Sequence, residues 1–374
     1  MKTKVGLVFG GRSGEHEVSV RSAGNVACAF NKEKYEIVPI AISIDGEWLG
    51  PAESVKVLSE EAQAAIGRDF EELKGRRVGL KFESGSKGFS LSSSGGSDEP
   101  LSVDVAFPAL HGTFGEDGTI QGMLEMAGIP FVGCGVLASA CGMDKVVMKS
   151  LFSEAGLPMC RYVWFLRSEW EADSDLVAKH VERTLGFPCF VKPANLGSSV
   201  GISKAADTDS LKDAISHAAE YDSKVIVEEC LTMREIECAI LGNDKPEASL
   251  PGEYLIRNKT KTFLDYTEKY SATGNNEFVV PSPVSEELAG KIREMAVTAF
   301  KAIDGSGLAR VDFFLRSDNG ALLVNEINTM PGLTDASGYP KMWEGSGVPF
   351  AEVLDRLIAL ATERSAERSS NRTK

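Results

Sequence analysis

The sequence predicts an α/β protein of two or three domains, and three observations support this. The chain has 374 residues, which is long for a single hydrophobic core. It opens with the buried strand "KVGLVFGG", whose glycines lead into a helical pattern. Near the other end, "ARVDFFLRSDNGALLVNEIN" joins two apolar strands through an Asp-Asn-Gly turn, which is a strong hairpin signal.

The first part of the chain alternates strands with a helix. After the opening strand, Val18, Val26 and Phe30 recur at roughly helical spacing. "YEIVPIAIS" is typical of a second strand, and "VDVAFPAL" at 103–110 of another buried strand that ends at a loop. Between them, residues 84–100 are rich in Gly and Ser, so we expect a surface hairpin or loop there.

Two further groups of elements follow. A helix is expected from about Asp144 to Ala155, because Gly156 and Pro158 end it. The strands "CFVKPA" and "VIVEECL" come next. From about Arg234, the strands "EIECAILG", "LARVDFFL" and "ALLVNEIN" precede a closing helix at about 350–361.

These changes of pattern divide the chain. We expect an N-terminal α/β domain at 1–140, a central domain at 141–232 and a C-terminal domain at 233–362. The tail at 363–374 is polar and lacks apolar anchors, so we expect it to be disordered.

The composition excludes several classes of function. The net charge of −14 opposes nonspecific association with nucleic acid or anionic membranes, so a small-molecule partner is expected. The sequence has no stretch as long as a membrane span and no signal-peptide pattern, which predicts a cytoplasmic protein. The seven cysteines include no CxxC pair, which argues against zinc ribbons and redox pairs.

The expected hairpin contains polar residues where apolar ones are usual. Arg310 and Asp312 lie on one face of the first strand, and Glu326 and Asn328 on one face of the second. Two carboxylates and an amide oxygen on apolar strands would be costly if buried alone, so a cation is the natural compensation. Oxygen ligands favour Mg²⁺ or Mn²⁺. The alternative is an exposed face with solvated charges, against which the flanking Phe, Leu and Val residues argue.

Whether the two polar pairs share a face depends on the length of the turn. A two-residue loop at 319–320 would pair Asp312 with Ile327, whereas a three-residue loop at 318–320 would pair it with Glu326. The longer loop suits a left-handed Gly320 beside a bulge, and it brings all four polar groups together.

A second candidate site is "KPANLGSSVG", which begins at Lys192. It lacks the ending of a P-loop, yet its backbone N–H groups and serine hydroxyls can approach a phosphate. A solvated turn is the alternative, so the loop needs partners. Candidates are Lys145 and the carboxylates of "VEECLTMREIE".

Two other glycine-rich motifs do not match well-known binding sites, the EF-hand and the dinucleotide-binding fingerprint. "HGTFGEDGTIQG", which begins at His111, lacks the EF-hand spacing. Gly10, Gly11 and Gly14 do not form GxGxxG, which weakens an NAD-dependent function. Glu15, at the edge of the helix that follows, is better placed to hold an amine.

Together these segments resemble the D-alanine–D-alanine ligase family, ATP-grasp enzymes of cell-wall synthesis, from Val5 to about Ala361. "HGTFGEDGTIQG" is similar to the first family signature, and "ARVDFFL" with "NEINTMPGLT" to the second. "GGRSGEHEVS", "KPANLGSSVG" and "DYTEKYSATG" are similar to further family segments. The resemblance implies a three-domain ATP-grasp fold: an N-terminal parallel α/β domain, plus central and C-terminal antiparallel α+β domains that enclose ATP.

The resemblance also implies residues that bind ATP and metal. The phosphates would be held by Lys145, Lys192 and Lys269. The adenine and ribose pocket would comprise Glu228, Glu229, Leu231 and Glu235. Two Mg²⁺ or Mn²⁺ ions would be held by Asp312, Glu326 and Asn328.

For the amino-acid substrates, the resemblance implies that Glu15 and His111 hold the first ammonium and Ser337 the second carboxylate. The chain departs from the family pattern at two positions. Arg234 stands where some relatives have proline, a change expected to be neutral. Gly338 stands where a larger apolar residue is common, which we expect to loosen the second pocket.

The implied reaction forms an acyl phosphate that the second amine attacks. Arg310 and the backbone N–H of Gly332 would face the oxyanion. Ser198 and Tyr270 would link Glu15 to a lid, "KTFLDYTEKYSATGNNE", because water must be excluded from the acyl phosphate.

Other functions remain to be compared. Ligases that use D-lactate or D-serine share the fold and the chemistry. Similar ligases that use lactate replace the lid tyrosine, so Tyr270 beside Lys269 favours a dipeptide product. A non-catalytic nucleotide-binding regulator would be expected to lack the metal carboxylates or Arg310, which are present. The resemblance further implies a homodimer.

Overall fold

A parallel sheet forms the centre of the N-terminal part of the computed structural model, which describes residues 1–80, 89–92, 99–197, 200–256 and 276–372. β1 (Thr3–Gly10) pairs in parallel with β2 (Tyr35–Ile42) and with β6 (Val105–Ala109). Buried apolar side chains such as Leu7 and Phe107 explain why these strands form. The predicted parallel sheet is confirmed.

Helices and a small sheet surround these strands. The helices are α1 (His16–Ala29), α2 (Pro51–Val57), α3 (Glu60–Ile66), the 3₁₀ turn η1 (Glu71–Leu73), α4 (Thr119–Met126) and α5 (Val136–Met143). The small antiparallel sheet comprises β3 (Arg77–Leu80), β4 (Phe89–Ser92) and β5 (Glu99–Leu101). A surface hairpin or a loop was expected for the Gly/Ser-rich segment, and the antiparallel pairing of β4 with β5 agrees with the hairpin.

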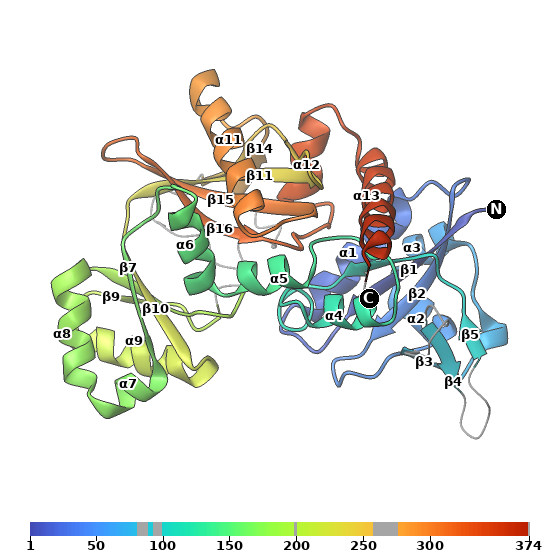
Figure 1. Ribbon diagram of the computed structural model, residues 1–374, viewed down its shortest axis with the longest axis horizontal. Helices are drawn as coiled ribbons and strands as arrows, with labels where there is room; N and C mark the ends of the chain where they lie inside the picture. Colours follow the sequence, from blue (N-terminus) through green and yellow to red (C-terminus); the bar gives the residue numbers. More distant parts are fainter. Residues whose placement is uncertain (81–88, 93–98, 198–199, 257–275, 373–374) are drawn as a thin grey trace.

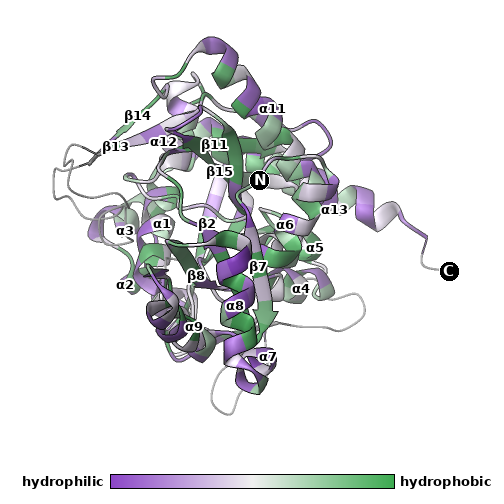
Figure 2. Ribbon diagram, turned by 90° about the vertical axis from the view of Figure 1, so that its left-hand side faces the viewer, coloured by the Kyte–Doolittle hydropathy of each residue, from purple (hydrophilic) through white to green (hydrophobic). Residues whose placement is uncertain are grey.

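The central part, at the lower left of Figure 1, is an antiparallel sheet in the order β7-β10-β8-β9. Its strands are β7 (Tyr162–Leu166), β8 (Cys189–Pro193), β9 (Ser203–Ala205) and β10 (Lys224–Glu229). Its helices are α6 (Lys145–Glu154), α7 (Arg167–Ala172), α8 (Ser174–Leu185) and α9 (Thr208–Tyr221). One face packs against α8 and α9 through Val181 and Ile215, and these helices carry both purple and green in Figure 2, as amphipathic helices do. The other face bears the polar residues described below.

The C-terminal part is a larger antiparallel sheet in the order β14-β13-β11-β15-β16, with β12 paired to β11. Its strands are β11 (Met233–Gly242), β12 (Glu247–Ala248), β13 (Gly252–Ile256), β14 (Asn276–Val279), β15 (Gly307–Arg316) and β16 (Leu322–Asn328). Its helices are α11 (Glu286–Ala302), α12 (Gly338–Gly345) and α13 (Phe350–Ser370). The antiparallel sheets expected for the two later domains are thus confirmed. The boundaries expected at 140 and 232 stay predictions.

The β15–β16 hairpin has the predicted pairing but reaches it differently. Asp312 lies opposite Glu326, and Arg310 opposite Asn328. The expected three-residue loop is wrong, because Arg316 donates its N–H to the Ala321 carbonyl at 2.9 Å and leaves a four-residue loop. A bulge then shifts the register by one residue between Asp312 and Phe313. The bulge, rather than the turn, aligns the polar pairs.

The prediction of a disordered tail from residue 363 is also wrong for most of its length, because α13 continues to Ser370. The Arg364 guanidinium donates to the carbonyls of Phe131 (2.9 Å) and Gly133 and to the Ser306 hydroxyl (2.6 Å). It also lies 4.4 Å from the centre of the Phe131 ring. A polar side chain therefore anchors the helix where apolar ones are missing from the pattern.

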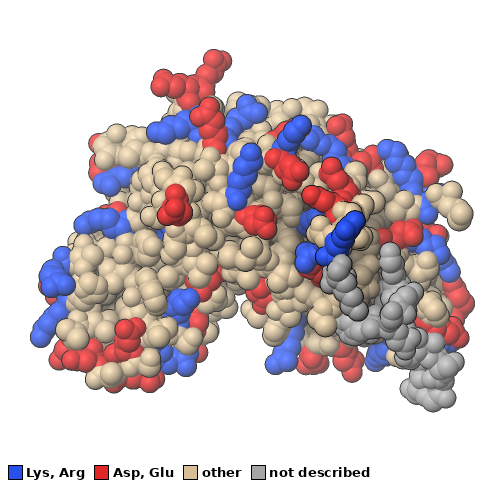
Figure 3. All heavy atoms as spheres, in the orientation of Figure 1, with Lys and Arg blue, Asp and Glu red and all other residues tan. Residues whose placement is uncertain are grey.

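The N- and C-terminal parts share a continuous apolar core. This core includes Leu7 and Phe107 of the parallel sheet together with Trp343 and Leu357 of α12 and α13. No helix within the described part of the chain is long and apolar enough to cross a membrane. Acidic and basic side chains are interspersed on the face shown in Figure 3, which is hollowed between the central lobe at lower left and the N-terminal lobe.

Candidate active site

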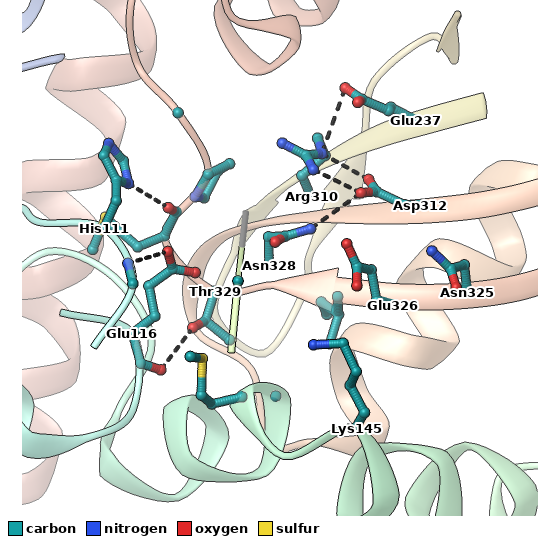
Figure 4. A pocket seen from close by; sticks show the side chains of 18 of the residues that line it. His111, Glu116, Lys145, Glu237, Arg310, Asp312, Asn325, Glu326, Asn328 and Thr329 are labelled. Carbon is teal, nitrogen blue, oxygen red and sulfur yellow. Dashed lines mark hydrogen bonds and ion pairs between the residues drawn. The ribbon is translucent and has the colours of Figure 1, made fainter. Parts of the chain in front are cut away.

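A pocket lies where the three parts of the chain meet. Its lining comes from N-terminal loops, from α6 with the loop after β8, and from β11, β15 and β16. Figure 4 shows His111 and Glu116 approaching from one side, Lys145 from α6 on another, and the polar residues of the hairpin between them.

The hairpin contributes a row of paired charges. The Arg310 guanidinium donates to both oxygens of Asp312, from Nε and from Nη2, each at 2.6 Å. The Asn328 amide donates to Asp312 Oδ2 at 3.2 Å, and Arg310 Nε lies 3.4 Å from Glu237 Oε2 on β11. Since Glu237 is the cross-strand neighbour of Asp312, β11 extends the row by one carboxylate.

The candidate metal ligands share this surface. Asp312 and Glu326 are direct cross-strand neighbours, and Asn328 is the next residue on the same face of β16. Among the described residues, no three His, Cys, Asp or Glu side chains form a metal-binding group, so an ion here would depend on the Asn328 amide oxygen. This all-oxygen donor set fits Mg²⁺ or Mn²⁺ in chemistry.

Helix α6 and the central sheet form one wall of the pocket, the lysine wall, to which they contribute Lys145 and Lys192. Asp144 caps α6 by accepting from the backbone N–H groups of Val146 and Val147, at 2.9 and 3.0 Å. The first helical residue is Lys145. Its ammonium donates to the carbonyl of Leu196, a residue of the "KPANLGSSVG" loop, at 2.7 Å. Burial lowers the pKa of Lys145. The expected pairing of Lys145 with this loop is thus present in the structure.

Lys192 reaches the same pocket from β8, and its partner is Glu228. Lys192 Nζ lies 2.6 Å from Glu228 Oε2, and Lys149 Nζ lies 2.8 Å from Glu228 Oε1. Burial acts to raise the pKa of Glu228, but the two lysines outweigh it and hold that pKa well below its usual range. Lys149 was missed by the sequence analysis, although it lies one helical turn after Lys145.

The residues implied for the adenine and ribose pocket separate in the structure. Glu235 lines the pocket, on the same face of the sheet as Glu237 and Asp312. Glu228, Glu229 and Leu231 lie outside its lining. The Glu229 carboxylate accepts from Arg161 Nε at 2.9 Å and from the Arg161 backbone N–H at 2.8 Å. Nucleotide contacts by these residues stay predictions.

The N-terminal loops contribute the opposite charge. Glu15 lines the pocket just before α1, and a Cβ added to Gly197 would lie 3.0 Å from Glu15 Oε1. A Cβ at Gly112, which has a φ of +70°, would lie 3.3 Å from the same oxygen. Two glycines therefore let the signature loop and the "KPANLGSSVG" loop approach this carboxylate closely.

His111 is buried and bonded through both ring nitrogens. Nδ1 lies 3.0 Å from the Met330 carbonyl, which fixes it as the donor, so Nε2 accepts from the Ser22 hydroxyl at 2.9 Å. The Ser22 oxygen also accepts the Leu333 N–H at 3.3 Å. Burial lowers the pKa of His111 and keeps it neutral. It thus positions the segment that contains Gly332, and a substrate role for it stays a prediction.

Glu116 was also missed. Its carboxylate accepts the Gly112 N–H at 2.9 Å, and its backbone carbonyl accepts the Thr329 hydroxyl at 3.5 Å. Burial, with the charge of Glu15 as the second cause, raises the pKa of Glu116 to about 8. In sequence this residue was one acid among several in a glycine-rich loop.

The structure shows what surrounds the two residues that are expected to depart from the family pattern. Arg234 donates to both oxygens of Glu253, at 2.7 and 2.6 Å. A Cβ at Gly338 would lie 2.4 Å from Glu237 Oε2 and 2.8 Å from Cζ of Phe278. The expected loosening is therefore wrong in its premise, because neighbouring side chains fill the space next to Gly338.

Of the remaining candidates, Ser337 is buried and lies outside the lining of the pocket. Its hydroxyl accepts the Thr334 N–H at 3.1 Å. Gly332 lines the pocket. Ser198, Lys269 and Tyr270 lie outside the residues that the structure describes.

Two family models match nearly the whole chain. The one described as "D-ala D-ala ligase N-terminus" matches residues 4–134, and "D-ala D-ala ligase C-terminus" matches residues 151–359. A D-alanine–D-alanine ligase from Geobacillus thermodenitrificans is 46% identical over 376 residues, covering 98% of each chain.

Solved structures are similar over the same length. The D-alanine–D-alanine ligase from Coxiella burnetii has a TM-score of 0.80 and 34% identity, covering 98% of this chain and 97% of that one. The VanG D-Ala:D-Ser ligase from Enterococcus faecalis has a TM-score of 0.81 and 38% identity, covering 96% of this chain and 100% of that one.

Proposed function

The chain belongs to the D-alanine–D-alanine ligase family and has its ATP-grasp fold, and from this premise we propose that it joins two D-alanines at the expense of ATP. The product would be D-alanyl-D-alanine, a precursor for peptidoglycan. The observation that carries the proposal is how charge is divided within one pocket. Glu15 and Glu116 of the N-terminal loops form an acidic wall, and Lys145 and Lys192 form a lysine wall. Arg310, paired with Asp312, lies between the two walls.

The acidic wall suits the ammonium of the first D-alanine. Glu15 lines the pocket from the N-terminal loops, and the loops that carry Gly112 and Gly197 pass close to its carboxylate. Held here, the substrate would direct its carboxylate toward the hairpin. The neutral, fully bonded His111 would keep the 330–333 backbone in place for the later steps.

The lysine wall suits the phosphates of ATP. Lys145 and Lys192 line the pocket, and the backbone of the "KPANLGSSVG" loop would cover the phosphates from above. Asp312, Glu326 and Asn328 would hold Mg²⁺ or Mn²⁺, which would offset the negative charge that builds up in phosphoryl transfer.

The chemistry would take two steps. A carboxylate oxygen of the first D-alanine attacks the terminal phosphorus of ATP, and ADP leaves. The amine of the second D-alanine, after losing a proton, attacks the acyl carbon, and inorganic phosphate leaves with its bonding electrons. Arg310 and the Gly332 N–H would stabilise the oxyanion between addition and departure, as donors aimed at developing charge do.

A D-Ala:D-Ser ligase is the second candidate, because the VanG structure is as similar in fold as the Coxiella burnetii enzyme. The 46% identity to the Geobacillus thermodenitrificans D-alanine–D-alanine ligase supports D-alanine, since identity to VanG is 38%; identity to the Coxiella burnetii enzyme is 34%. The lid residues Lys269 and Tyr270 would complete the site and favour an amine as the second nucleophile. A homodimer and a cytoplasmic location are further parts of the proposal that rest on the family resemblance.

The proposal is tested by incubating the protein with ATP, Mg²⁺ and D-alanine and measuring ADP and dipeptide. We expect equal amounts of ADP, phosphate and D-alanyl-D-alanine, with less product when D-serine or D-lactate competes as second substrate. ADP release that does not depend on D-alanine would contradict the proposal. Preferential formation of the D-Ala-D-Ser product would favour the second candidate.

A further inference from the structure

A buried chain of three charges runs from the interior of the central domain to the pocket. Its members are Lys149 on α6, Glu228 on β10 and Lys192 on β8, whose side chains are 1%, 4% and 13% exposed. The outermost member, Lys192, lines the pocket, and Lys149 and Glu228 do not. The order of burial places Lys149 behind Glu228 as seen from the pocket.

We propose that Lys149 is a positioning residue for nucleotide binding, which shares the Glu228 carboxylate with Lys192 and so keeps Lys192 available to the phosphates of ATP. The inference rests on the proposed function, because it assumes that this pocket binds a nucleotide. It adds a residue that contacts no substrate to the machinery of the site.

The carboxylate of Glu228 has two oxygens, and each faces a different lysine. Oε1 lies 2.8 Å from Lys149 Nζ, and Oε2 lies 2.6 Å from Lys192 Nζ. If Lys149 were absent, the buried carboxylate would depend on Lys192 alone. The pair would then be neutral, and Lys192, which already lies 2.6 Å from Oε2, would be the only cation left to compensate that carboxylate and would be less available to a phosphate. With Lys149 present, the three groups carry a net positive charge that a polyphosphate can use.

The surroundings hold the Lys149 ammonium in one place. Its Nζ lies 3.6 Å from Cys160 Sγ and 5.5 Å from the centre of the Tyr162 ring, on the strand next to Glu228. The same helix presents Lys145 one turn earlier, and Asp144 fixes its first turn. Helix α6 therefore positions both Lys145, which lines the pocket, and Lys149, which lies behind Glu228.

The experiment compares variants by isothermal titration with ADP, without D-alanine. Lys149→Gln keeps a hydrogen-bond donor toward Glu228 but removes the charge, and we expect the Kd for ADP to rise by about tenfold or more. Lys149→Arg keeps the charge, and we expect its Kd to stay within about threefold of the wild type. In assays of turnover, the KM for D-alanine should change less than the KM for ATP.

A double-mutant cycle tests whether the effect passes through Glu228. In a Glu228→Gln background the carboxylate charge is gone, so adding Lys149→Gln should change the Kd for ADP by less than about twofold. An equal loss in both backgrounds would overturn the inference, as would a wild-type Kd in Lys149→Gln. If Lys149→Gln does not fold, Lys149→Arg decides: retained affinity supports the role of charge, and a tenfold loss overturns it.

Arg364→Met is the matched control, because it removes a partly buried cation that is bonded far from the lysine wall. We expect a lower Tm with an unchanged Kd for ADP; a similar loss of affinity here would overturn the inference by showing that any lost buried cation weakens the site. A wild-type protein that binds ADP but does not ligate D-alanine would contradict the proposed function while leaving this test intact.

Discussion

Glu116, which lines the pocket, and Glu228, which lies behind Lys192, are both withdrawn from solvent at least in part, yet their environments drive them to opposite protonation states. Glu228 is bonded to two lysines, which hold its pKa well below the usual range. Glu116 accepts a backbone N–H and lies near the charge of Glu15, and burial raises its pKa to about 8. Burial alone therefore does not decide the charge of an acid; the sign of its neighbours does.

This difference extends to the two walls of the pocket. The lysine wall, made by α6 and the central sheet, concentrates positive charge where phosphates would bind. The acidic wall, made by the N-terminal loops, offers a carboxylate to an ammonium and keeps a second one protonated close by. One pocket can thus hold a polyanion and an amino acid side by side, because each meets its complementary charge.

Arg310 lies between the walls, and its loss should break the arrangement most severely. In Arg310→Met, the Asp312 carboxylate loses both of its guanidinium bonds and the oxyanion loses its charged donor. We expect kcat to fall by about 10²- to 10³-fold, the range seen when an oxyanion donor is removed. The measurement is steady-state release of phosphate with saturating ATP and D-alanine. A kcat within about threefold of the wild type would contradict the role of Arg310.

A pair of substitutions tests whether the walls act separately. Glu15→Gln should raise the KM for D-alanine by about tenfold or more and leave the KM for ATP nearly unchanged. Lys145→Met should do the reverse, because its ammonium lies on the phosphate side. Both KM values are obtained from assays that vary one substrate at a time. Equal effects of each variant on both substrates would show that the division into two walls is not functional.

Gly338 tests the corner where the second substrate is expected. A Cβ there would meet Glu237 and Phe278, so Gly338→Leu should overpack the corner and displace Glu237 from Arg310. Overpacking of this kind typically lowers the free energy of unfolding by about 1–3 kcal/mol. We expect the displacement of Glu237 from Arg310 to lower kcat/KM for the second D-alanine as well, by about tenfold. Adding Phe278→Ala should restore part of the loss. A Gly338→Leu protein with wild-type kinetics would mean that the corner is open after all.

Much of the fold followed from local patterns. Buried runs such as "KVGLVFGG" and the helix from Asp144 were visible because their periodicity and end signals depend on neighbouring residues alone. The polar pairs of the hairpin were visible as an anomaly within apolar strands. Their exact alignment was not, since the bulge next to Asp312 leaves no signature in the turn sequence.

The missed features depend on contacts between distant segments. The environment of Glu116 depends on the contact between its loop and Thr329, more than two hundred residues away. The anchoring of α13 by Arg364 depends on carbonyls of the N-terminal part. The filled space at Gly338 depends on Phe278. Lys149 is different: its spacing of four from Lys145 was a local signal, and it could have been found.

Replacing Glu116 should produce the smallest effect and the most specific test of the contrast with Glu228. A carboxyl whose pKa is raised in the folded state contributes stability below its unfolded pKa and loses it as pH rises through the folded value. With a pKa raised to about 8, the wild type should lose stability from this group between about pH 5 and pH 9. Glu116→Gln cannot ionise and should not show that loss. Allowing for the influence of Glu15, we expect the stability of the variant relative to the wild type to grow by about 1–2 kcal/mol over this interval, or about 2–4 °C in Tm.

Glu228→Gln should show a pH dependence of the opposite sign, because the pKa of Glu228 is lowered and its contribution to stability disappears on acidification. Thermal unfolding of wild type and Glu116→Gln at pH 5, 7 and 9 tests the first effect, and parallel curves would show that Glu116 does not titrate in this interval. Thermal unfolding of wild type and Glu228→Gln at pH 5 and at about pH 3 tests the second effect, because the contribution of Glu228 is lost only below the ordinary pKa of a glutamate.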